Sequence, residues 1–120
     1  MLTVSRDEAY LFIGIQCMDK SALPPIPADP DAAPSGRIYQ DISGALVLAT
    51  EIAGGVVALS KQNAQLGLYG VGLPISATTP LGRYWVRITF DVGGSTQAEL
   101  VLFEVVDSTN PLSKSLASIG

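Results

Sequence analysis

The chain contains no histidine and a single cysteine, Cys17. Without imidazole, histidine general-base catalysis, histidine metal ligands and the Ser-His and Cys-His nucleophile pairs are excluded. One cysteine cannot form an intrachain disulfide or a thiolate cluster for zinc or iron-sulfur centres. Because Cys17 lies among apolar neighbours, we expect a packed side chain rather than a reactive thiol. We therefore predict that the chain is not an enzyme and holds no cofactor and no metal.

Positive charge and long apolar runs are also scarce. Seven Lys and Arg against eleven Asp and Glu give a net charge of −4 and a pI near 4.5, so the basic footprint of a nucleic-acid-binding protein is missing. The apolar stretches are far shorter than the roughly 20 residues that cross a bilayer. Acids in Met1–Glu8 stand where a signal peptide would be basic. We expect a soluble protein that is made in the cytoplasm and binds neither nucleic acid nor membrane.

What the chain does have is enough apolar material for one folded domain. It has 120 residues, of which 48% are hydrophobic and 15% charged. A chain of this size buries about two thirds of the surface that its unfolded form exposes. We predict one domain over residues 1–106, which includes a proline-rich loop over residues 20–41, and a tail or arm over residues 107–120.

The first half of the chain predicts short strands around the proline-rich segment. Residues 8–18 are apolar and favour a strand. The prolines between residues 20 and 41 argue against a helix or a central strand, so we expect an extended arm or crossover there. Residues 42–52 and 56–59 are predicted as two strands around a Gly54-Gly55 turn, with a helix over residues 43–52 as the alternative.

Residues 66–74 predict a further strand, on which large and small side chains separate. Tyr69, Val71 and Leu73 alternate toward one face, while the glycines between them fall on the other. Glycines weaken a strand and often mark a bulge or a close approach of another backbone.

The clearest pattern is a hairpin made by residues 83–92 and 95–106. Residues 83–92 alternate between an apolar set, Tyr84, Val86, Ile88 and Phe90, and a more polar set, and the Gly93-Gly94 pair that follows is typical of a two-residue hairpin loop. This loop sets Val92 opposite Ser95, and the same register sets Tyr84 opposite Phe103 and Val86 opposite Val101. One face of the hairpin is therefore predicted to line the core.

The other face of the same hairpin is not purely polar. The register places Trp85 opposite Leu102 and Arg87 opposite Leu100. Two interpretations remain open for this patch. It is either a second buried face, covered by another sheet or by the proline-rich loop, or an exposed contact surface for a subunit or ligand.

The last residues change character and are rich in serine. Asn110-Pro111 is typical of a helix start, and Leu112, Leu116 and Ile119 share the spacing of one helical face. The segment is too short to be helical alone. It is either a frayed tail or an arm that docks its apolar stripe on this domain or on a neighbour.

Two polar motifs are weaker candidates for a site. Asp29-Pro30-Asp31 places two carboxylates in a loop, as calcium sites do, but the remaining ligands of an EF-hand do not follow, so we expect solvated loop charges. Ser60-Lys61 sets a hydroxyl beside an ammonium, yet adjacent residues of a strand point to opposite faces.

Short alternating segments, glycine-rich turns and one long loop favour an all-β fold, an antiparallel β-sandwich of about seven strands. Three segments then resemble the ending of immunoglobulin-like sandwich modules, including macroglobulin-type domains and small sandwich domains of tailed-phage virion proteins. The segments are Leu68-Tyr69-Gly70, Pro80 to Val86 and Leu102 to Val105. Asp31 to Tyr39 is similar to the start of such phage modules, where a proline-bearing stretch precedes a strand.

This resemblance implies a structural virion component, such as a decoration, neck or tail protein, that contacts other copies of itself and other virion proteins. The expected localisation is the virion, and the expected contact residues are Trp85, Arg87, Leu100, Leu102, Leu112, Leu116 and Ile119. A carbohydrate- or protein-binding module is the alternative, with Trp85 and either Tyr84 or Tyr69 as stacking platforms.

Overall fold

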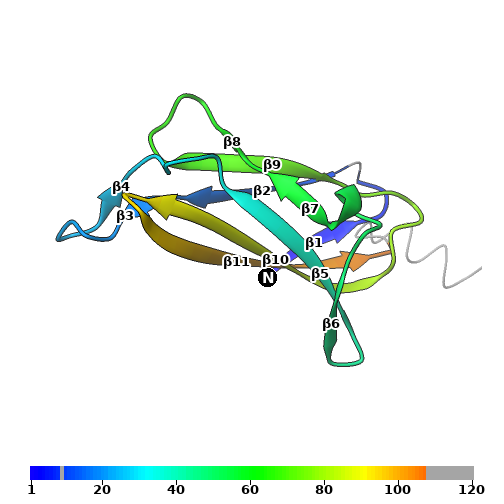
Figure 1. Ribbon diagram of the computed structural model, residues 1–120. Helices are drawn as coiled ribbons and strands as arrows, with labels where there is room; N and C mark the ends of the chain where they lie inside the picture. Colours follow the sequence, from blue (N-terminus) through cyan, green and yellow to red (C-terminus); the bar gives the residue numbers. More distant parts are fainter. Residues whose placement is uncertain (9, 108–120) are drawn as a thin grey trace, which may run out of the picture.

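Two sheets packed face to face hold most of the strands (Figure 1). The computed structural model describes residues 1–8 and 10–107, and apart from one short 3₁₀ turn its regular structure is all β. The larger sheet has the order β1-β11-β10-β5-β6, with β7 also paired to β5, and the smaller sheet has the order β2-β9-β8. The strands are β1 (Leu2–Ser5), β2 (Tyr10–Gln16), β3 (Met18–Asp19), β4 (Ile26–Pro27), β5 (Ser35–Ile42), β6 (Ala45–Leu48), β7 (Val56–Ala58), β8 (Ser60–Lys61), β9 (Leu68–Pro74), β10 (Gly82–Val92) and β11 (Ser95–Val106).

The long hairpin of β10 and β11 has the register that its glycine loop predicts. Val92 faces Ser95 across the loop, and Tyr84 faces Phe103 further along the strands. Tyr84 and Phe103 are fully buried, and their rings stack with centroids 5.1 Å apart. The prediction that this face lines the core is confirmed.

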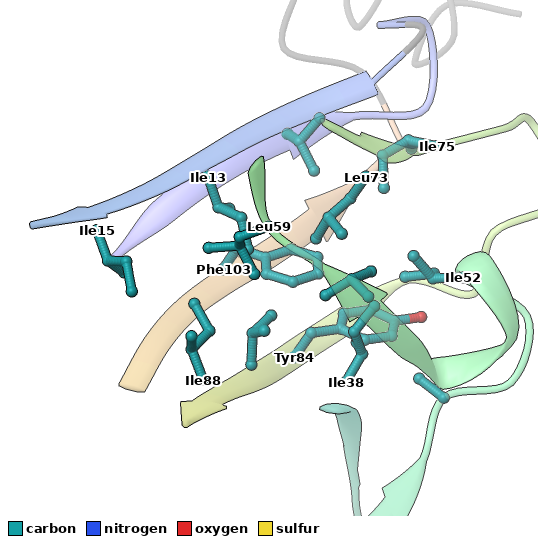
Figure 2. Close-up of a cluster of buried hydrophobic side chains, with 14 of the residues drawn as sticks. Ile13, Ile15, Ile38, Ile52, Leu59, Leu73, Ile75, Tyr84, Ile88 and Phe103 are labelled. Atoms are coloured by element: carbon teal, nitrogen blue, oxygen red, sulfur yellow. The ribbon is translucent and has the colours of Figure 1, made fainter. Parts of the chain in front are cut away.

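The core lies between the two sheets and draws on both (Figure 2). Ile13 and Leu73 point from the smaller sheet toward Tyr84 and Phe103 of the larger one. The predicted strand over residues 66–74 is confirmed as β9, which buries Leu73 and packs Tyr69 and Val71 against the core. Removal of this apolar surface from water is the main force that holds the sheets together.

The tyrosine also anchors the turn before its own strand. The Tyr84 hydroxyl donates a hydrogen bond to the carbonyl oxygen of Pro80 at 2.6 Å. Burial raises the pKa of Tyr84 to about 12, so the hydroxyl keeps its proton at neutral pH.

The expectation that residues 20–41 contain no central strand is wrong for their last third. β5 starts at Ser35, directly after the buried Pro34, and lies between β10 and β6 in the larger sheet. The physical reason is that no proline follows Pro34 until residue 74, so every residue from Ser35 to Ile42 can donate its backbone N–H to a neighbouring strand. Gly36 and Ile38 are buried while Ser35 and Arg37 are exposed, which is the alternation of a half-buried strand.

The hairpin predicted around Gly54-Gly55 is also wrong, and so is the alternative helix. β6 and β7 form at the expected places, but each pairs with β5 rather than with the other. The tight turn is instead Ser43-Gly44 between β5 and β6, where both residues have positive φ (54° and 85°). Gly54 and Gly55 belong to the short 3₁₀ turn over residues 53–55.

One pairing departs from a purely antiparallel sheet. β1 pairs in parallel with β11, with Val4 beside Val105, and both side chains are buried. β1 could not be predicted from the sequence, because its few residues show too little alternation to distinguish a strand from a chain terminus. The sheet is therefore mixed rather than antiparallel throughout.

Replacing Tyr84 by Phe removes one hydroxyl from the core and leaves the Pro80 carbonyl without its donor. We expect the free energy of unfolding to fall by about 1–2 kcal/mol, measured as a lower urea midpoint with an unchanged m-value. Tyr10→Phe is the matched control, because the Tyr10 side chain is exposed and should change stability by less than about 0.5 kcal/mol. Equal midpoints for the two variants would contradict the role of the hydroxyl.

Candidate functional site

The outer face of the larger sheet carries an apolar row that crosses four strands. Leu48 faces Tyr39, Tyr39 faces Trp85, and Trp85 faces Leu102, so the four side chains stand side by side on β6, β5, β10 and β11. Alternation turns their neighbours Tyr84 and Phe103 inward, and the row outward. We call these four residues the apolar row.

A pair of arginines lies next to the apolar row. Arg37 on β5 faces Arg87 on β10, and Arg87 faces Leu100 on β11. Both arginines are exposed, and neither side chain has an ion pair or hydrogen bond to another residue in the described part of the chain. Like charges directly opposite each other on a sheet are unfavourable. This pair is therefore suited to an external carboxylate.

Acidic residues lie on the other side of the apolar row. Glu104 faces Arg83, and the Arg83 Nε atom lies 3.8 Å from a Glu104 carboxylate oxygen. Asp41, which faces Leu46, accepts a hydrogen bond from the Gly44 backbone N–H at 3.0 Å. On the outer face, the apolar row thus lies between a basic row of Arg37 and Arg87 and a mainly acidic row that contains Asp41, Arg83 and Glu104.

The β5–β6 hairpin extends this surface beyond the body of the sheet (Figure 1). Every residue of β6 is exposed, although its sequence is Ala-Leu-Val-Leu. Leu46 and Val47 are 51% and 48% exposed, on opposite sides of the strand. Apolar exposure on both sides of one strand is typical of a segment that contacts another molecule.

Of the expected contact residues, Trp85, Arg87, Leu100 and Leu102 are brought together on this outer face. A shallow groove of about 390 Å³, lined by Met1, Leu2, Leu100, Val101 and Leu102, continues the surface toward β1. Trp85 and Leu102 are half-buried, and Arg87 and Leu100 are exposed. The other three candidates, Leu112, Leu116 and Ile119, lie outside the described residues.

Tyr39 and Leu48 are the members of the apolar row that sequence reasoning missed. The alternation of Arg37-Ile38-Tyr39 is the signal that could have placed Tyr39 on a strand, but it lies within residues 20–41, for which the prolines predict a loop. Leu48 could not be placed on this face without its partner strand, because β6 pairs with β5 and not with β7.

A second exposed aromatic patch lies on the outer side of the smaller sheet. Tyr10 and Phe12 are 61% and 49% exposed on β2. The Phe12 ring lies over Gly70, and the Tyr10 ring lies 3.3 Å from where a Cβ atom of Gly72 would be. A side chain at Gly70 would also come within 2.9 Å of the Ile13 carbonyl oxygen. The glycines of β9 therefore let both rings lie close to the sheet.

Asp29 and Asp31 are exposed loop charges, as the sequence predicts, but both carboxylates also accept hydrogen bonds that the sequence does not show. Asp29 accepts hydrogen bonds from Lys61 Nζ at 2.7 Å and from the Gly67 backbone N–H at 2.8 Å. The bond from Lys61 is the main cause that lowers the pKa of Asp29. Asp31 accepts bonds from the N–H groups of Gly93 and Gly94, at 3.2 and 2.9 Å.

These bonds give the two acids a structural role. Asp29 ties the proline-rich segment to the β8–β9 region, and Asp31 ties it to the tip of the β10–β11 hairpin. Over residues 1–8 and 10–107, no group of three His, Cys, Asp or Glu side chains is arranged to hold a metal ion. The same residues include no helix with the length and apolarity to cross a membrane.

Known proteins give no further guide to the site, since no protein-family model and no curated protein matches this chain.

Cys17 is fully buried between the sheets, as its apolar neighbours predict. Burial, followed by the charges of Asp29 and Glu99, raises the pKa of the thiol from 9.0 to about 11. Between pH 9 and pH 11 the Cys17 thiol therefore keeps its proton in the native state and releases it in the unfolded state. The contribution of this thiol to the free energy of unfolding is present below pH 9 and is lost as the pH rises from 9 to 11.

A thiol reagent should therefore modify Cys17 slowly while the chain is folded. At pH 8 the raised pKa alone reduces the thiolate population by about a factor of 100, and burial slows the reaction further. The measurement is the rate of colour release from a disulfide reagent, with and without urea. Equal rates in the folded and unfolded chain would show that Cys17 is accessible.

Proposed function

We propose that this chain is a non-enzymatic assembly protein that works through protein–protein contacts on the outer face of its larger sheet. The observation that carries the proposal is the apolar row beside the unpaired Arg37 and Arg87. Aromatic side chains and arginine are enriched at the energetic centres of interfaces. A surface with Trp85 and Tyr39 in direct register presents a rigid anchor of that kind.

The finer fold assignment within this proposal is an immunoglobulin-like sandwich. In that fold, strands D, E and B form part of one sheet, and strands C, F and G form the other, to which variable-type domains add C′. The orders β8-β9-β2 and β6-β5-β10-β11 correspond to D-E-B and C′-C-F-G. The hydrogen bond from Tyr84 to Pro80 further supports this assignment, because such domains tie a tyrosine near the start of strand F to the backbone upstream.

The particle to which we assign the protein is a tailed-phage virion, where it would act as a decoration, neck or tail component. The support is the resemblance of Pro80 to Val86 and Leu102 to Val105 to small sandwich modules of such virions. A domain that offers an extended apolar face and a projecting hairpin suits repeated contacts in an assembly.

Replacing Trp85 by Asp tests the outer face directly. Because a charge in the centre of a contact must be desolvated without a partner, we expect self-association to weaken at least about tenfold. Sedimentation velocity over a concentration series measures this. Leu23→Asp is the matched control, since Leu23 is 93% exposed on the loop between β3 and β4.

The same variants test the particle assignment. When the chain is co-expressed with the genes that neighbour its own in the genome, the wild type and the Leu23→Asp variant should be recovered in particles. The Trp85→Asp variant should remain in the soluble fraction. A wild-type chain that stays monomeric at high concentration, together with undiminished incorporation of the Trp85 variant, would contradict the proposed function.

A carbohydrate-binding module is the second candidate, although its platform differs from the one that the sequence suggests. Tyr84 is fully buried, so it cannot stack on a ligand. The observation that favours the second candidate is the patch of Tyr10 and Phe12 over the glycines of β9. Two exposed rings close to a sheet can stack on the apolar faces of pyranose rings.

Binding of soluble oligosaccharides would distinguish the two functions. The second candidate predicts saturable binding by calorimetry that falls at least about tenfold on Phe12→Ala and is unchanged on Trp85→Asp. No binding across a panel of oligosaccharides would remove this candidate and leave the assembly function in place.

A further inference from the structure

Strand β6 is an unprotected sheet edge. It ends the strand order of the larger sheet, and no strand in the described part of the chain pairs with its outer side. Natural sheet edges usually carry a charged residue, a proline or a bulge, or are covered by a loop. Ala45–Leu48 contains no charge and no proline, and all four residues are exposed. The edge at β8, by comparison, carries Lys61.

The register of the β5–β6 hairpin shows which main-chain groups of β6 point away from β5. Ile42 and Ala45 flank the two-residue turn, so they form a hydrogen-bonded pair, and pairs alternate from there. The bond from the Ala49 N–H to the Ile38 carbonyl oxygen, at 2.9 Å, fits this alternation. The N–H and C=O groups of Leu46 and Leu48 therefore point away from β5, toward a side of β6 that no described strand occupies. The Leu48 carbonyl oxygen on this side also accepts a hydrogen bond from the Thr50 N–H at 3.1 Å.

We propose that β6 pairs with β6 of a second copy, in antiparallel orientation about a two-fold axis at Val47. In this register Leu46 lies opposite Leu48 of the other copy on both sides of the axis. The Leu48 N–H of each copy then donates to the Leu46 carbonyl of the other. The Leu48 carbonyl, which already accepts from Thr50, takes a second bond from the Leu46 N–H of the other copy, and the two larger sheets join into one. This inference rests on the proposed assembly function and names a partner for it.

The side chains of β6 are suited to a second copy of themselves. Leu46 and Leu48 share the face of Tyr39, so two leucines from each copy would meet and continue the apolar row across the axis. Val47 lies on the opposite face and would meet its own counterpart. With no charge on β6, the self-pairing creates no like-charge contact. A partner of different sequence would gain no such symmetry.

A cysteine at the axis tests the register. In a non-hydrogen-bonded antiparallel pair, Cα atoms lie about 4.5 Å apart, which is within the range that a disulfide spans. Val47→Cys should therefore form an inter-subunit disulfide under mild oxidation, seen as a dimer band on a non-reducing gel. The buried Cys17 is the only native thiol and does not compete.

Ile42→Cys is the matched control for the disulfide. Ile42 is 48% exposed on the same hairpin, but in the proposed dimer its counterpart lies three strand spacings away across the sheet and four residues away along it, about 20 Å in total. We expect cross-linking of the Val47 variant to be at least about ten times faster. Equal rates for the two variants would overturn the proposed register.

A charge pair at the axis provides the second test. Val47→Lys and Val47→Glu should each be monomeric in sedimentation velocity at concentrations where the wild type is dimeric, and a mixture of the two should again form dimers. Dimers of the Val47→Lys variant alone would overturn the proposal. If the β6 tests fail while Trp85→Asp still abolishes assembly, the edge pairing is wrong and the proposed function stands.

Discussion

The stacked pair of Tyr84 and Phe103 is the constraint on which the rest of the structure depends. Their rings are fully buried, 5.1 Å apart and inclined by 6°, and they come from the two strands of the longest hairpin. Side chains on a strand alternate with a period of two, so burying these rings determines the position of every other residue on both strands. The register that fills the core therefore also places Trp85 and Leu102 together on the outside. The core and the candidate interaction surface are two results of one pairing.

The candidate surface also depends on where β5 enters the larger sheet. Tyr39 and Leu48 extend the row of Trp85 and Leu102 only because β5 lies beside β10 and holds β6 on its other side. Hydrogen bonds of Asp29 and Asp31 hold the chain before β5 against the β8–β9 region and the tip of the β10–β11 hairpin. The proline-rich segment therefore has a structural role, since it crosses between the sheets and delivers β5 to its place.

The outer face and the β6 edge form one continuous apolar surface at the boundary of the larger sheet. Exposed leucines and an uncharged edge lower solubility and favour uncontrolled pairing, and natural sheet proteins generally avoid them. Such a surface is suited to a protein that is covered when it assembles. Arg37 and Arg87, whose side chains have no ion pair with any described residue, add a charged feature that would favour an acidic contact next to the apolar one.

The sequence by itself determined the all-β character, the β10–β11 register, the burial of Cys17 and the two-sided character of the Trp85 strand. All of these follow from local rules, namely period-two alternation and the geometry of a two-residue glycine loop. Only the tertiary structure decided that Ser35–Ile42 is a central strand, that β6 and β7 both pair with β5, and that β1 is parallel to β11. These are pairings between distant segments. Alternation shows which side of a strand is apolar, but it does not show which strand lies next to it.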